Sequence, residues 1–542
     1  MTFSRTNTSA ATLTKNRTEG SITSESGMCV TCVDGCVGMC EIGKSAYRGH
    51  EVLYPQPFGV ITAAAEKQYP LGYSHFSIMG TAVGAVGVQA DSDAAIFPAV
   101  DLEVRIGTLR FRYPWLIPGI GSTDIAKNNW EGLAIGSALA GTALTIGENV
   151  AGMDPEAVIK DGRVLDTVDL KRRVKLYQNA QRDGYGAIVV QANVEDTRLE
   201  VQEYAIEKLG VEVVELKWGQ GAKDIGGEVK IKSLKKAQLL RDRGYIVLPD
   251  PLDPAIIKAF EAGAFTEFER HSRVGMVSEE AFGARVKELR AAGAKHVFLK
   301  TGCYRPADLA RALAFASKYR IDLLTVDAAG GGTGMSPWRM MNEWGIPPVE
   351  FHSLVYRFAE RLALEGAYVP PIALAGGFAF EDQLFKGLAL GAPFVKLIGM
   401  ARAPIAAAMV GKTIGKTIEA HSLPVYVERF GHTREEIFVT ANQLRRQLGD
   451  AAFEQVPAGA LGLYTYYERL AQGLRQLMAG SRKFALEFMT RHDLAALTRE
   501  AAEVSGIPYV TEVDRDEIDD ILAIATANGA PRKAAGKESP KA

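Results

Sequence analysis

Short apolar runs alternate with longer amphipathic stretches between residues 101 and 415. Continuous runs of about four to eight residues rich in Val and Ile are typical of strands buried on both faces. The stretches between them, such as EEAFGARVKELRAAG, have apolar residues at helical spacing. Repeated strand–helix units predict a parallel sheet. The nine candidate strands are residues 114–120, 142–147, 187–192, 211–216, 245–249, 296–300, 321–327, 371–375 and 394–398.

A closed barrel and an open, doubly wound sheet both fit this pattern. Gly, Lys, Asp and Glu recur just after nearly every apolar run. All strand ends of a barrel meet at one site, whereas an open sheet concentrates functional residues at one switch point. We therefore predict an α/β fold with a (β/α)8 TIM barrel over residues 101–415. Residues 245–249 are then an excursion in the loop after strand four.

The segments outside the barrel differ in composition. Residues 1–27 are rich in Ser and Thr and lack an apolar stretch, and residues 531–542 are polar. Both segments are therefore predicted to be disordered. The stretch YTYYERLAQGLRQLMAGSRKFALEFM has an apolar face at helical spacing and predicts a helical cover for the barrel. The predicted regions are a disordered arm (1–27), a Cys-rich region (28–100), a helical C-terminal extension (416–530) and a disordered tail (531–542).

Charge and hydropathy exclude two classes of partner. The chain has 62 basic and 64 acidic residues, spread along its length, for a net charge of −2. Without a basic stripe, we expect no nucleic-acid partner. No stretch approaches the roughly 18 apolar residues of a membrane helix, so we expect no membrane partner and a cytoplasmic location.

Four of the five cysteines lie close together, at Cys29, Cys32, Cys36 and Cys40. A disulfide framework would spread cysteines to close longer loops. Four thiolates in one compact loop can ligate a [4Fe–4S] cluster without a second segment, and this is the predicted ligand. Zinc is the main alternative, although zinc sites usually pair two separated knuckles, and unligated thiols are the remaining one. We interpret Cys303 as a small buried residue and not as a fifth ligand.

Glycine-rich turns follow three of the late strands, in VDAAGGGTGMSP (326–337), ALAGG (373–377) and LIGMA (397–401). A glycine run after a buried strand lets backbone N–H groups approach a planar ring or a phosphate. In many barrels the last two strand–helix turns form a phosphate site. Plain tight turns and helix–strand packing are the alternatives, and we favour a phosphate site for the last pair.

Four ordered motifs resemble the FMN-binding domain of glutamate synthase (large subunit). They are TIGENVAGMDP (145–155), ELKWGQGAKDIGGE (215–228), VDAAGGGTGMSP and the pair ALAGG and LIGMA. They follow the order of that family across most of residues 100–415. The YYERLAQGLRQLM helix and the RHDLAAL stretch resemble its C-terminal continuation. The resemblance implies FMN as the cofactor.

The resemblance also implies roles for individual residues. Lys300 would face the pyrimidine side of the flavin, where a cation stabilises the anionic reduced ring. Others would lie along the isoalloxazine: Gly119, Gly121, Ser122 and Gln191. A third set would hold the ribityl phosphate: Gly331, Gly332, Gly376, Gly377, Gly399, Met400 and Ala401. The family binds its 2-oxoacid or imino substrate at the positions of Glu148, Lys217 and Lys223. Without the resemblance, each lysine would be interpreted as a solvent-exposed surface charge.

The sequence departs from the family at three places. Glu228 stands where the family commonly has Gln, in a loop one residue shorter, and an acid beside a dicarboxylate is unfavourable unless it is protonated or turned away. This departure puts 2-oxoglutarate itself in question. The iron–sulfur cysteines of the family follow the barrel, whereas here they precede it. Residue 2 is Thr, so the amidotransferase domain with its N-terminal Cys nucleophile is not expected.

Together these features predict an FMN- and iron–sulfur-dependent oxidoreductase acting on CH–NH2 donors in nitrogen metabolism. It would reduce an imino acid formed from a 2-oxoacid (2-oxoglutarate-like) and ammonia or an amine. The alternatives are an N-alkylglutamate (N-methylglutamate) synthase-type subunit and a flavin and iron–sulfur electron-transfer subunit of a larger complex. Of these functions, only that of an electron-transfer subunit would require no substrate-binding residues. Expected partners are an electron-donor protein or partner subunit, a separate amidotransferase subunit, and further copies in an oligomer.

Overall fold

The computed structural model describes residues 32–38, 40–49, 69–219, 229–329, 331 and 344–526. Eight parallel strands in this part of the chain close into a barrel in the order β13, β14, β15, β16, β4, β5, β8 and β9. Pairing of β9 with β13 completes the circle, so the predicted TIM barrel is confirmed. The strands are β4 (Trp115–Ile120), β5 (Ala143–Ile146), β8 (Ala187–Ala192), β9 (Val213–Lys217), β13 (His296–Gly302), β14 (Leu323–Asp327), β15 (Ile372–Ala375) and β16 (Val395–Gly399).

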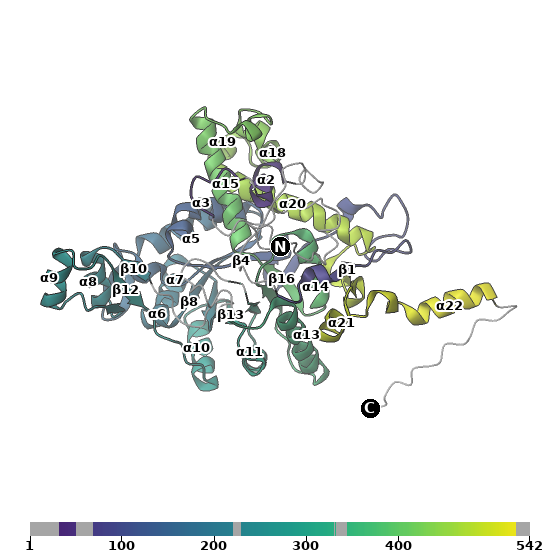
Figure 1. Cartoon of the computed structure of the whole chain (residues 1–542), viewed down its shortest axis with the longest axis horizontal. Helices are drawn as coiled ribbons and strands as arrows, with labels where there is room; N and C mark the ends of the chain where they lie inside the picture. The colour runs from purple at the N-terminus through teal and green to yellow at the C-terminus, as the bar shows by residue number, and fades with distance from the viewer. Residues whose placement is uncertain are drawn as a thin grey trace.

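The ninth predicted strand lies outside the barrel, as expected. β11 (Ile246–Leu248) pairs antiparallel with β12 (Phe268–His271), which also pairs with β10 (Val229–Ile231). With α8 (Leu234–Asp242) and α9 (Pro254–Glu261), these strands form an excursion between β9 and β13. It extends to the left of the barrel in Figure 1 and buries an apolar core of its own.

Helices connect the barrel strands and form the outer layer (Figure 1). Several begin at a Ser or Thr whose side-chain oxygen accepts a backbone N–H of the first turn, as Thr123, Thr167 and Ser278 do. The connecting helices are α3 (Asp124–Leu139), α5 (Val168–Ala180), α7 (Val201–Leu209), α10 (Glu279–Ala291), α11 (Pro306–Lys318), α13 (Pro348–Leu364), α14 (Glu381–Leu390) and α15 (Arg402–Glu419).

A hairpin closes the N-terminal end of the barrel. It consists of β2 (Val104–Ile106) and β3 (Leu109–Phe111). Its apolar side chains form one buried cluster with residues at the starts of the barrel strands, such as Leu116 and Val213. This end is therefore filled by protein, which leaves the C-terminal ends of the strands as the place for a site.

One long C-terminal helix lies across the barrel helices. α20 (Ala458–Gly480) packs on α15, α3, α14 and α2 (Glu41–Arg48). Glycines allow close approach: a Cβ at Gly132 of α3 would lie 3.0 Å from the carbonyl carbon of Gly459. A Cβ at Gly411 of α15 would lie 2.9 Å from the Cα of Gly462. Helices this close need small residues at the contact.

The predicted C-terminal region differs from the structure in two details. α15 runs to Glu419, so the boundary at 415 falls inside a helix. The region is not all helical, because β17 (Leu494–Ala496) pairs antiparallel with β1 (Phe76–Ile78). A three-residue strand is too short to show a period in the sequence.

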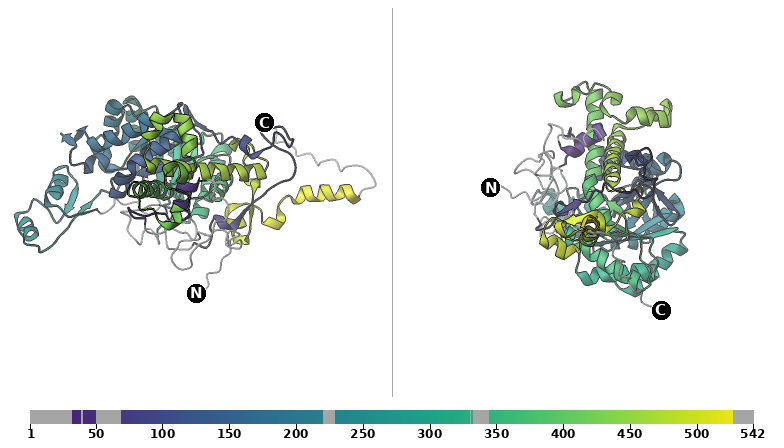
Figure 2. Two further views of the ribbon diagram at one scale, coloured as in Figure 1. Left: turned by 90° about the horizontal axis from the view of Figure 1, so that it is seen from above. Right: turned by 90° about the vertical axis from the view of Figure 1, so that its right-hand side faces the viewer.

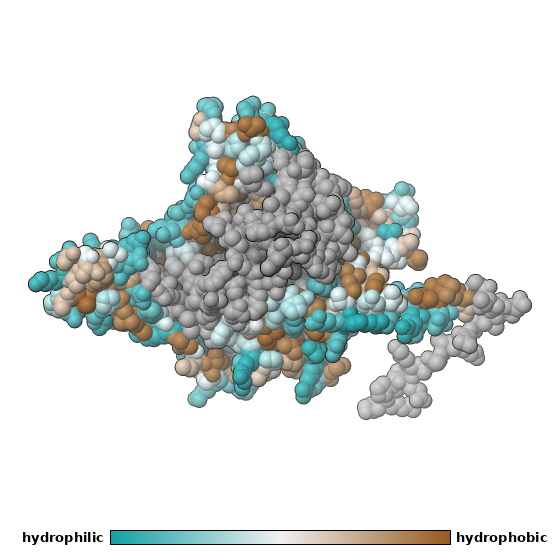
Figure 3. Space-filling model, in the orientation of Figure 1, coloured by the Kyte–Doolittle hydropathy of each residue, from teal (hydrophilic) through white to brown (hydrophobic). Residues whose placement is uncertain are grey.

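The last described helix projects from the molecule. α22 (Arg515–Thr526) extends away from the barrel in Figures 1 and 2. Its Ile518, Ile521 and Leu522 are about half exposed, and apolar colour gathers on this helix in Figure 3. Within the described residues, no helix is both long and apolar enough to span a membrane.

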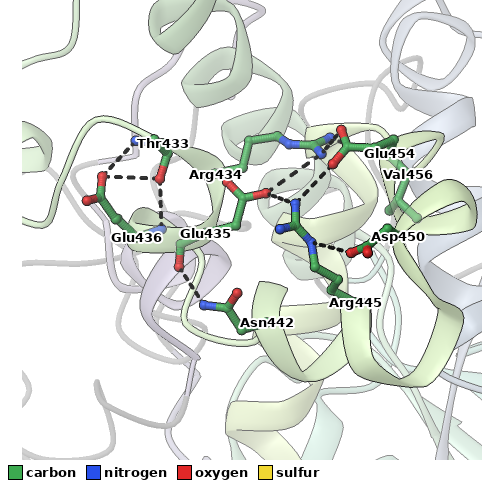
Figure 4. A network of polar contacts seen from close by, with 9 residues as sticks. All are labelled: Thr433, Arg434, Glu435, Glu436, Asn442, Arg445, Asp450, Glu454 and Val456. Carbon is green, nitrogen blue, oxygen red and sulfur yellow. Dashed lines mark hydrogen bonds and ion pairs between the residues drawn. The ribbon is translucent and has the colours of Figure 1, made fainter.

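A charged network fixes the segment that contacts α2 (Figure 4). It joins α17 (Arg434–Ile437), α18 (Ala441–Leu448) and α19 (Asp450–Glu454). Arg445 donates to Glu435 at 2.6 Å and to Glu454 at 3.0 Å. The backbone N–H of Val439, between α17 and α18, donates to the carbonyl of Tyr47 at 2.9 Å, which holds α2 in place.

Candidate active site

Polar residues gather at the C-terminal ends of β8, β9, β13 and β14. The parallel register pairs Gln191 with Glu215, and Lys300 with both Lys217 and Thr325. Gln191, Glu215 and Lys300 are all at least 96% buried. A run of polar groups this deep in an apolar barrel is costly unless the groups satisfy one another or a ligand. The arrangement therefore marks this end as the candidate site.

Two predicted substrate residues meet at the mouth of the barrel. Lys217, the last residue of β9, donates from Nζ to Oε1 of Glu148 at 2.6 Å. The side chains are 9% and 18% exposed, so the pair is mostly shielded from solvent but reachable. A cation and an anion side by side can bind a carboxylate and stabilise an iminium, respectively.

Gln191 has one satisfied and one unsatisfied side-chain atom. Its Nε2 donates to Oε1 of Glu215 at 2.5 Å. Its Oε1 is buried without a hydrogen-bond partner among the described residues. A Cβ at Gly119 would lie 2.4 Å from that oxygen, so only glycine fits there. A fixed, unsatisfied carbonyl oxygen in a barrel mouth is complementary to an N–H donor of a ligand.

Lys300 lies in a buried set of charges. Its Nζ is 3.1 Å from Oδ2 of Asp327, and the two side chains are 5% and 7% exposed. Burial alone would lower the pKa of Lys300, but Asp327 and Glu215 raise it above its ordinary value. Burial raises the pKa of Glu215 despite the nearby lysines. Lys300 is therefore held as a cation, the form expected beside a reduced flavin.

The turn after β4 lies against the substrate pair. A Cβ at Gly121 would lie 2.7 Å from the carbonyl oxygen of Glu148. The carbonyl of Gly121 accepts from Nη1 of Arg173 at 2.9 Å, and that arginine is fully buried. Ser122 follows and is partly exposed. Gly119 and Gly121 thus lie beside Gln191 and Glu148, as a shared site requires.

The two late turns lie side by side. The register pairs Ala375 with Gly399 at the ends of β15 and β16. Gly376 and Gly377 have φ of 119° and 107°, a region that favours glycine. A Cβ at Gly376 would lie 2.8 Å from the Cβ of Ala328, whereas Gly377 faces open space. Such turns expose backbone N–H groups to an anion.

The other predicted phosphate residues have different surroundings. Ala401 precedes α15, so the N-terminus of an 18-residue helix lies at the turn. The side chain of Met400 is buried and accepts from Tyr466 at 3.7 Å, so only its backbone is available there. A Cβ at Gly331 would clash with Asp327 at 2.2 Å. Gly332 lies outside the described residues.

A histidine supports the Gly376–Gly377 turn from behind. Nε2 of His352 lies 3.2 Å from the carbonyl oxygen of Ala375, and Nδ1 lies 2.6 Å from the hydroxyl of Tyr73. Burial lowers the pKa of His352 to about 4, so the ring is neutral. Nε2 then carries the proton, because a carbonyl can only accept. The ring stacks on Phe378 at 5.7 Å.

The cysteine segment lies in the outer helical layer. Cys40 caps α2, and its Sγ accepts from the N–H of Gly43 at 3.4 Å; Sγ of Cys36 accepts from Gly38 at the same distance. In the described part of the chain, no three His, Cys, Asp or Glu side chains are grouped to hold a metal ion. Cys29 lies outside that part, so Cys32, Cys36 and Cys40 do not by themselves form the predicted metal site.

Further predicted residues remain unplaced, and residues that were not predicted enter the site. Lys223 and Glu228 lie outside the described residues. Asp196 and Arg270 are almost fully buried, and each influences the charge balance around Glu148. Arg270 stacks on Tyr245 at 5.2 Å. Arg270 lies in β12 of the excursion, so it reaches the barrel mouth only through tertiary packing.

Solved structures similar to this chain are remote in sequence. The flavin-binding domain of baker's yeast flavocytochrome b2 is 13% identical, with 87% of this chain and 84% of that chain covered and a TM-score of 0.45. Mandelate oxidase with (S)-4-hydroxymandelic acid is 14% identical, with 77% and 87% covered and a TM-score of 0.42. No curated protein matches the chain.

One family model matches part of the barrel. The matched residues contain β13 to β16, and therefore Lys300, Asp327 and both late turns. Glu148, Lys217 and the clustered cysteines lie outside the match. Over residues 270–410, this chain matches the family described as the conserved region in glutamate synthase.

Proposed function

We propose that this chain is a glutamate synthase-like oxidoreductase that uses FMN to reduce an imino acid. The imino acid forms from a 2-oxoacid and ammonia or an amine. The observation that carries the proposal is the ion pair of Lys217 and Glu148 at the barrel mouth. The glutamate synthase match over residues 270–410, which includes both late turns, supports it.

The residues at the mouth fit FMN. Gly376, Gly377 and the start of α15 would hold the phosphate through backbone N–H groups. The unsatisfied Oε1 of Gln191 offers an acceptor to the ring, and Gly119 leaves room beside it. Lys300 supplies a buried cation. Bound FMN supplies two-electron chemistry, with hydride delivered to an electrophilic carbon.

The substrate pair has two separable tasks. Lys217 binds a carboxylate of the oxoacid, because its Nζ is a compact cation at the barrel mouth. Glu148 keeps a negative charge beside the iminium nitrogen and can hold its proton. Condensation of oxoacid and amine releases water. Two electrons and two protons then convert the C=N bond into a C–N single bond.

The electrons must come from outside the substrate pair. We propose a reduced protein carrier or partner subunit as the source. A [4Fe–4S] cluster at Cys29, Cys32, Cys36 and Cys40 remains our proposal on their spacing. The described cysteines do not form that site alone, so no step is assigned to them.

The test is reoxidation of the reduced protein by its substrates. Protein purified and reduced without oxygen is mixed with a 2-oxoacid and ammonium or methylamine, and flavin absorbance is followed. We expect rapid reoxidation only when both substrates are present. Lys217→Met should slow it strongly, and Lys208→Met, at an exposed position on α7, should not. Absence of flavin, or reoxidation that ignores both substrates, overturns the proposal.

The same assay separates the alternatives. A preference for methylamine over ammonium favours an N-alkylglutamate synthase-type subunit. An electron-transfer subunit would be reoxidised by an acceptor protein and not by oxoacids. The mostly buried Lys217–Glu148 pair argues against that alternative, because electron transfer alone has no use for it.

A further inference from the structure

Asp196 joins two segments at the barrel mouth. It is the third residue of α6 (Val194–Arg198), the short helix after β8, and is 1% exposed. Its Oδ2 accepts from the N–H of Asn193, its own helix cap, at 3.4 Å. Both carboxylate oxygens also accept from the N–H of Asn149, at 3.1 and 2.9 Å. The second contact reaches the loop after β5, 47 residues away.

Asn149 has a backbone conformation that needs support. Its φ is 64°, in the left-handed region, which costs free energy for any residue with a Cβ, although asparagine adopts it more readily than most. Asn149 is the first residue before α4 (Val150–Met153), and its own side chain makes no cap. The carboxylate of Asp196 therefore supplies the hydrogen bonds that favour this turn.

The turn at Asn149 fixes the direction of Glu148. The carbonyl of Glu148 is pressed against Gly121, where an added Cβ would lie at 2.7 Å. The next peptide N–H is held by Asp196. Clamped on both sides, the backbone of Glu148 presents its side chain to Lys217.

Charges from every neighbouring element face Asp196. Burial, and then the charge of Glu148, raise its pKa, while the N–H of Asn149 and the charge of Lys217 lower it; the result is about 7. From the excursion, Arg270 and Tyr245 also lie close enough to interact with it. Neighbouring Glu195 is occupied by Arg273 at 2.8 Å and Arg198 at 3.2 Å.

We propose that Asp196 is a positioning residue, which acts through the left-handed turn at Asn149 to hold Glu148 against Lys217. The role rests on the proposed function, in which Glu148 acts on the substrate. Asp196 itself does not touch the substrate. Its ionised form offers both carboxylate oxygens to the single N–H of Asn149, so turnover depends on that form.

The test compares five variants in the reoxidation assay, counting the Glu148→Gln background itself. Asp196→Ala should lower kcat about 100-fold with KM little changed, because a small misplacement of a reacting group has an effect of that order. Lys208→Met, at an exposed position on α7, is the control and should retain wild-type turnover. In a Glu148→Gln background, Asp196→Ala should add no further loss, because both changes act through one carboxylate. Turnover of the wild type should rise with pH through about 7, and Asp196→Asn should lose that step.

A crystal structure of Asp196→Ala gives a measurement independent of activity. We expect Asn149 to leave the left-handed region and the Glu148–Lys217 contact to open beyond about 4 Å. Additive effects of Asp196→Ala and Glu148→Gln, or an unchanged contact in that structure, overturn the proposal. If the wild type shows no reoxidation by substrates, the proposed function fails, and the crystal structure still decides the role of Asp196 in the turn.

Discussion

Lys217 and Glu148 form their 2.6 Å ion pair across an intervening strand. Lys217 ends β9, Glu148 follows β5, and β8 lies between these strands in the barrel. The two side chains therefore lean toward each other over the end of β8. Each charge balances the other in the protein without substrate, which offsets part of the desolvation free energy of the two mostly buried groups. A substrate carboxylate that binds Lys217 must compete with this partner.

Removal of either partner should slow the chemical step and spare the cofactor. Glu148→Gln keeps the shape but loses the anion, and we expect reoxidation by oxoacid and amine to slow about 100-fold, which corresponds to about 2.7 kcal/mol. FMN should stay bound and reducible by dithionite, because its contacts come from other loops. Stopped-flow absorbance measures the rate. Loss of flavin from this variant would show that Glu148 belongs to the cofactor site.

Lys223 belongs to the same prediction, although it lies outside the described residues. The resemblance places it on the substrate, so Lys223→Ala should also keep FMN and slow reoxidation. Unchanged turnover of both this variant and Glu148→Gln would mean that the resemblance covers the cofactor site alone.

A methyl group at Gly377 should weaken FMN binding. Its φ of 107° is strained for alanine, yet the position faces open space, so the change alters the turn without a steric clash. We expect the Kd of FMN to rise at least about tenfold, which is 1.4 kcal/mol. Flavin fluorescence during titration of the apoprotein measures it. Gly184→Ala is the matched control, with a φ of 70° and open space; equal affinities of the two variants would contradict the phosphate assignment.

The cysteine segment should bind iron and inorganic sulfide. Cys36→Ser should remove both from protein prepared without oxygen and leave FMN bound, because the flavin contacts lie in the barrel. Metal and sulfide analysis gives the answer. Cys303→Ala is the control, since that residue is buried beside Gly345 in the barrel. About one zinc per chain without sulfide would instead establish the alternative ligand.

Asp196 should make stability depend on pH in an unusual direction. Its pKa is raised to about 7 in the folded protein, whereas the unfolded chain has an ordinary aspartate near 4. The folded state therefore holds the proton more tightly, and this contribution to stability is full below about pH 4 and is lost as pH rises through 7. Asp196→Asn should gain stability relative to the wild type between pH 5 and pH 8, by on the order of a few kcal/mol.

Denaturant unfolding at the two pH values measures this difference. Glu195→Gln is not a suitable control, because Glu195 binds Arg273 and Arg198. Lys208→Met is suitable, since it changes an exposed lysine on α7 and leaves the Asp196 carboxylate in place. A difference between Asp196→Asn and the wild type that does not change with pH would mean that Asp196 does not titrate in this range.

The barrel and its mouth could be predicted because short, local sequence patterns determine them. Each barrel strand is a short run of apolar residues, and polar residues that follow such runs must meet once the sheet closes. Lys217 and Glu148 are an example, since each lies at the C-terminal end of a strand and they form the ion pair. The late glycine turns are another, because the positive φ of Gly376 requires glycine.

The residues that sequence reasoning missed reach the site through tertiary packing. Glu215 lies within an apolar strand, and only its inward direction shows that it binds Gln191. Asp196 resembles an ordinary helix-capping residue, and its contact with Asn149 joins distant loops. Arg270 belongs to the excursion, whose docking on the mouth has no periodic signal. A charge inside an apolar strand was the one local hint, at Glu215.

A ladder of backbone hydrogen bonds joins the segment before the barrel to the segment after it. This ladder limits whether the barrel can be moved alone into another protein. β1 pairs with β17, and farther along Val86 donates to Arg482 and Asp101 donates to Phe484, each at 2.9 Å. The segment before the barrel is thus bound to the segment after it, and α20 fills the surface between them. A protein cut to residues 101–415 would lack this ladder, because of the bonded residues only Asp101 remains, and it would expose the small-residue face of α15. The barrel is therefore not an interchangeable cassette, because the segments that precede and follow it are hydrogen-bonded to each other.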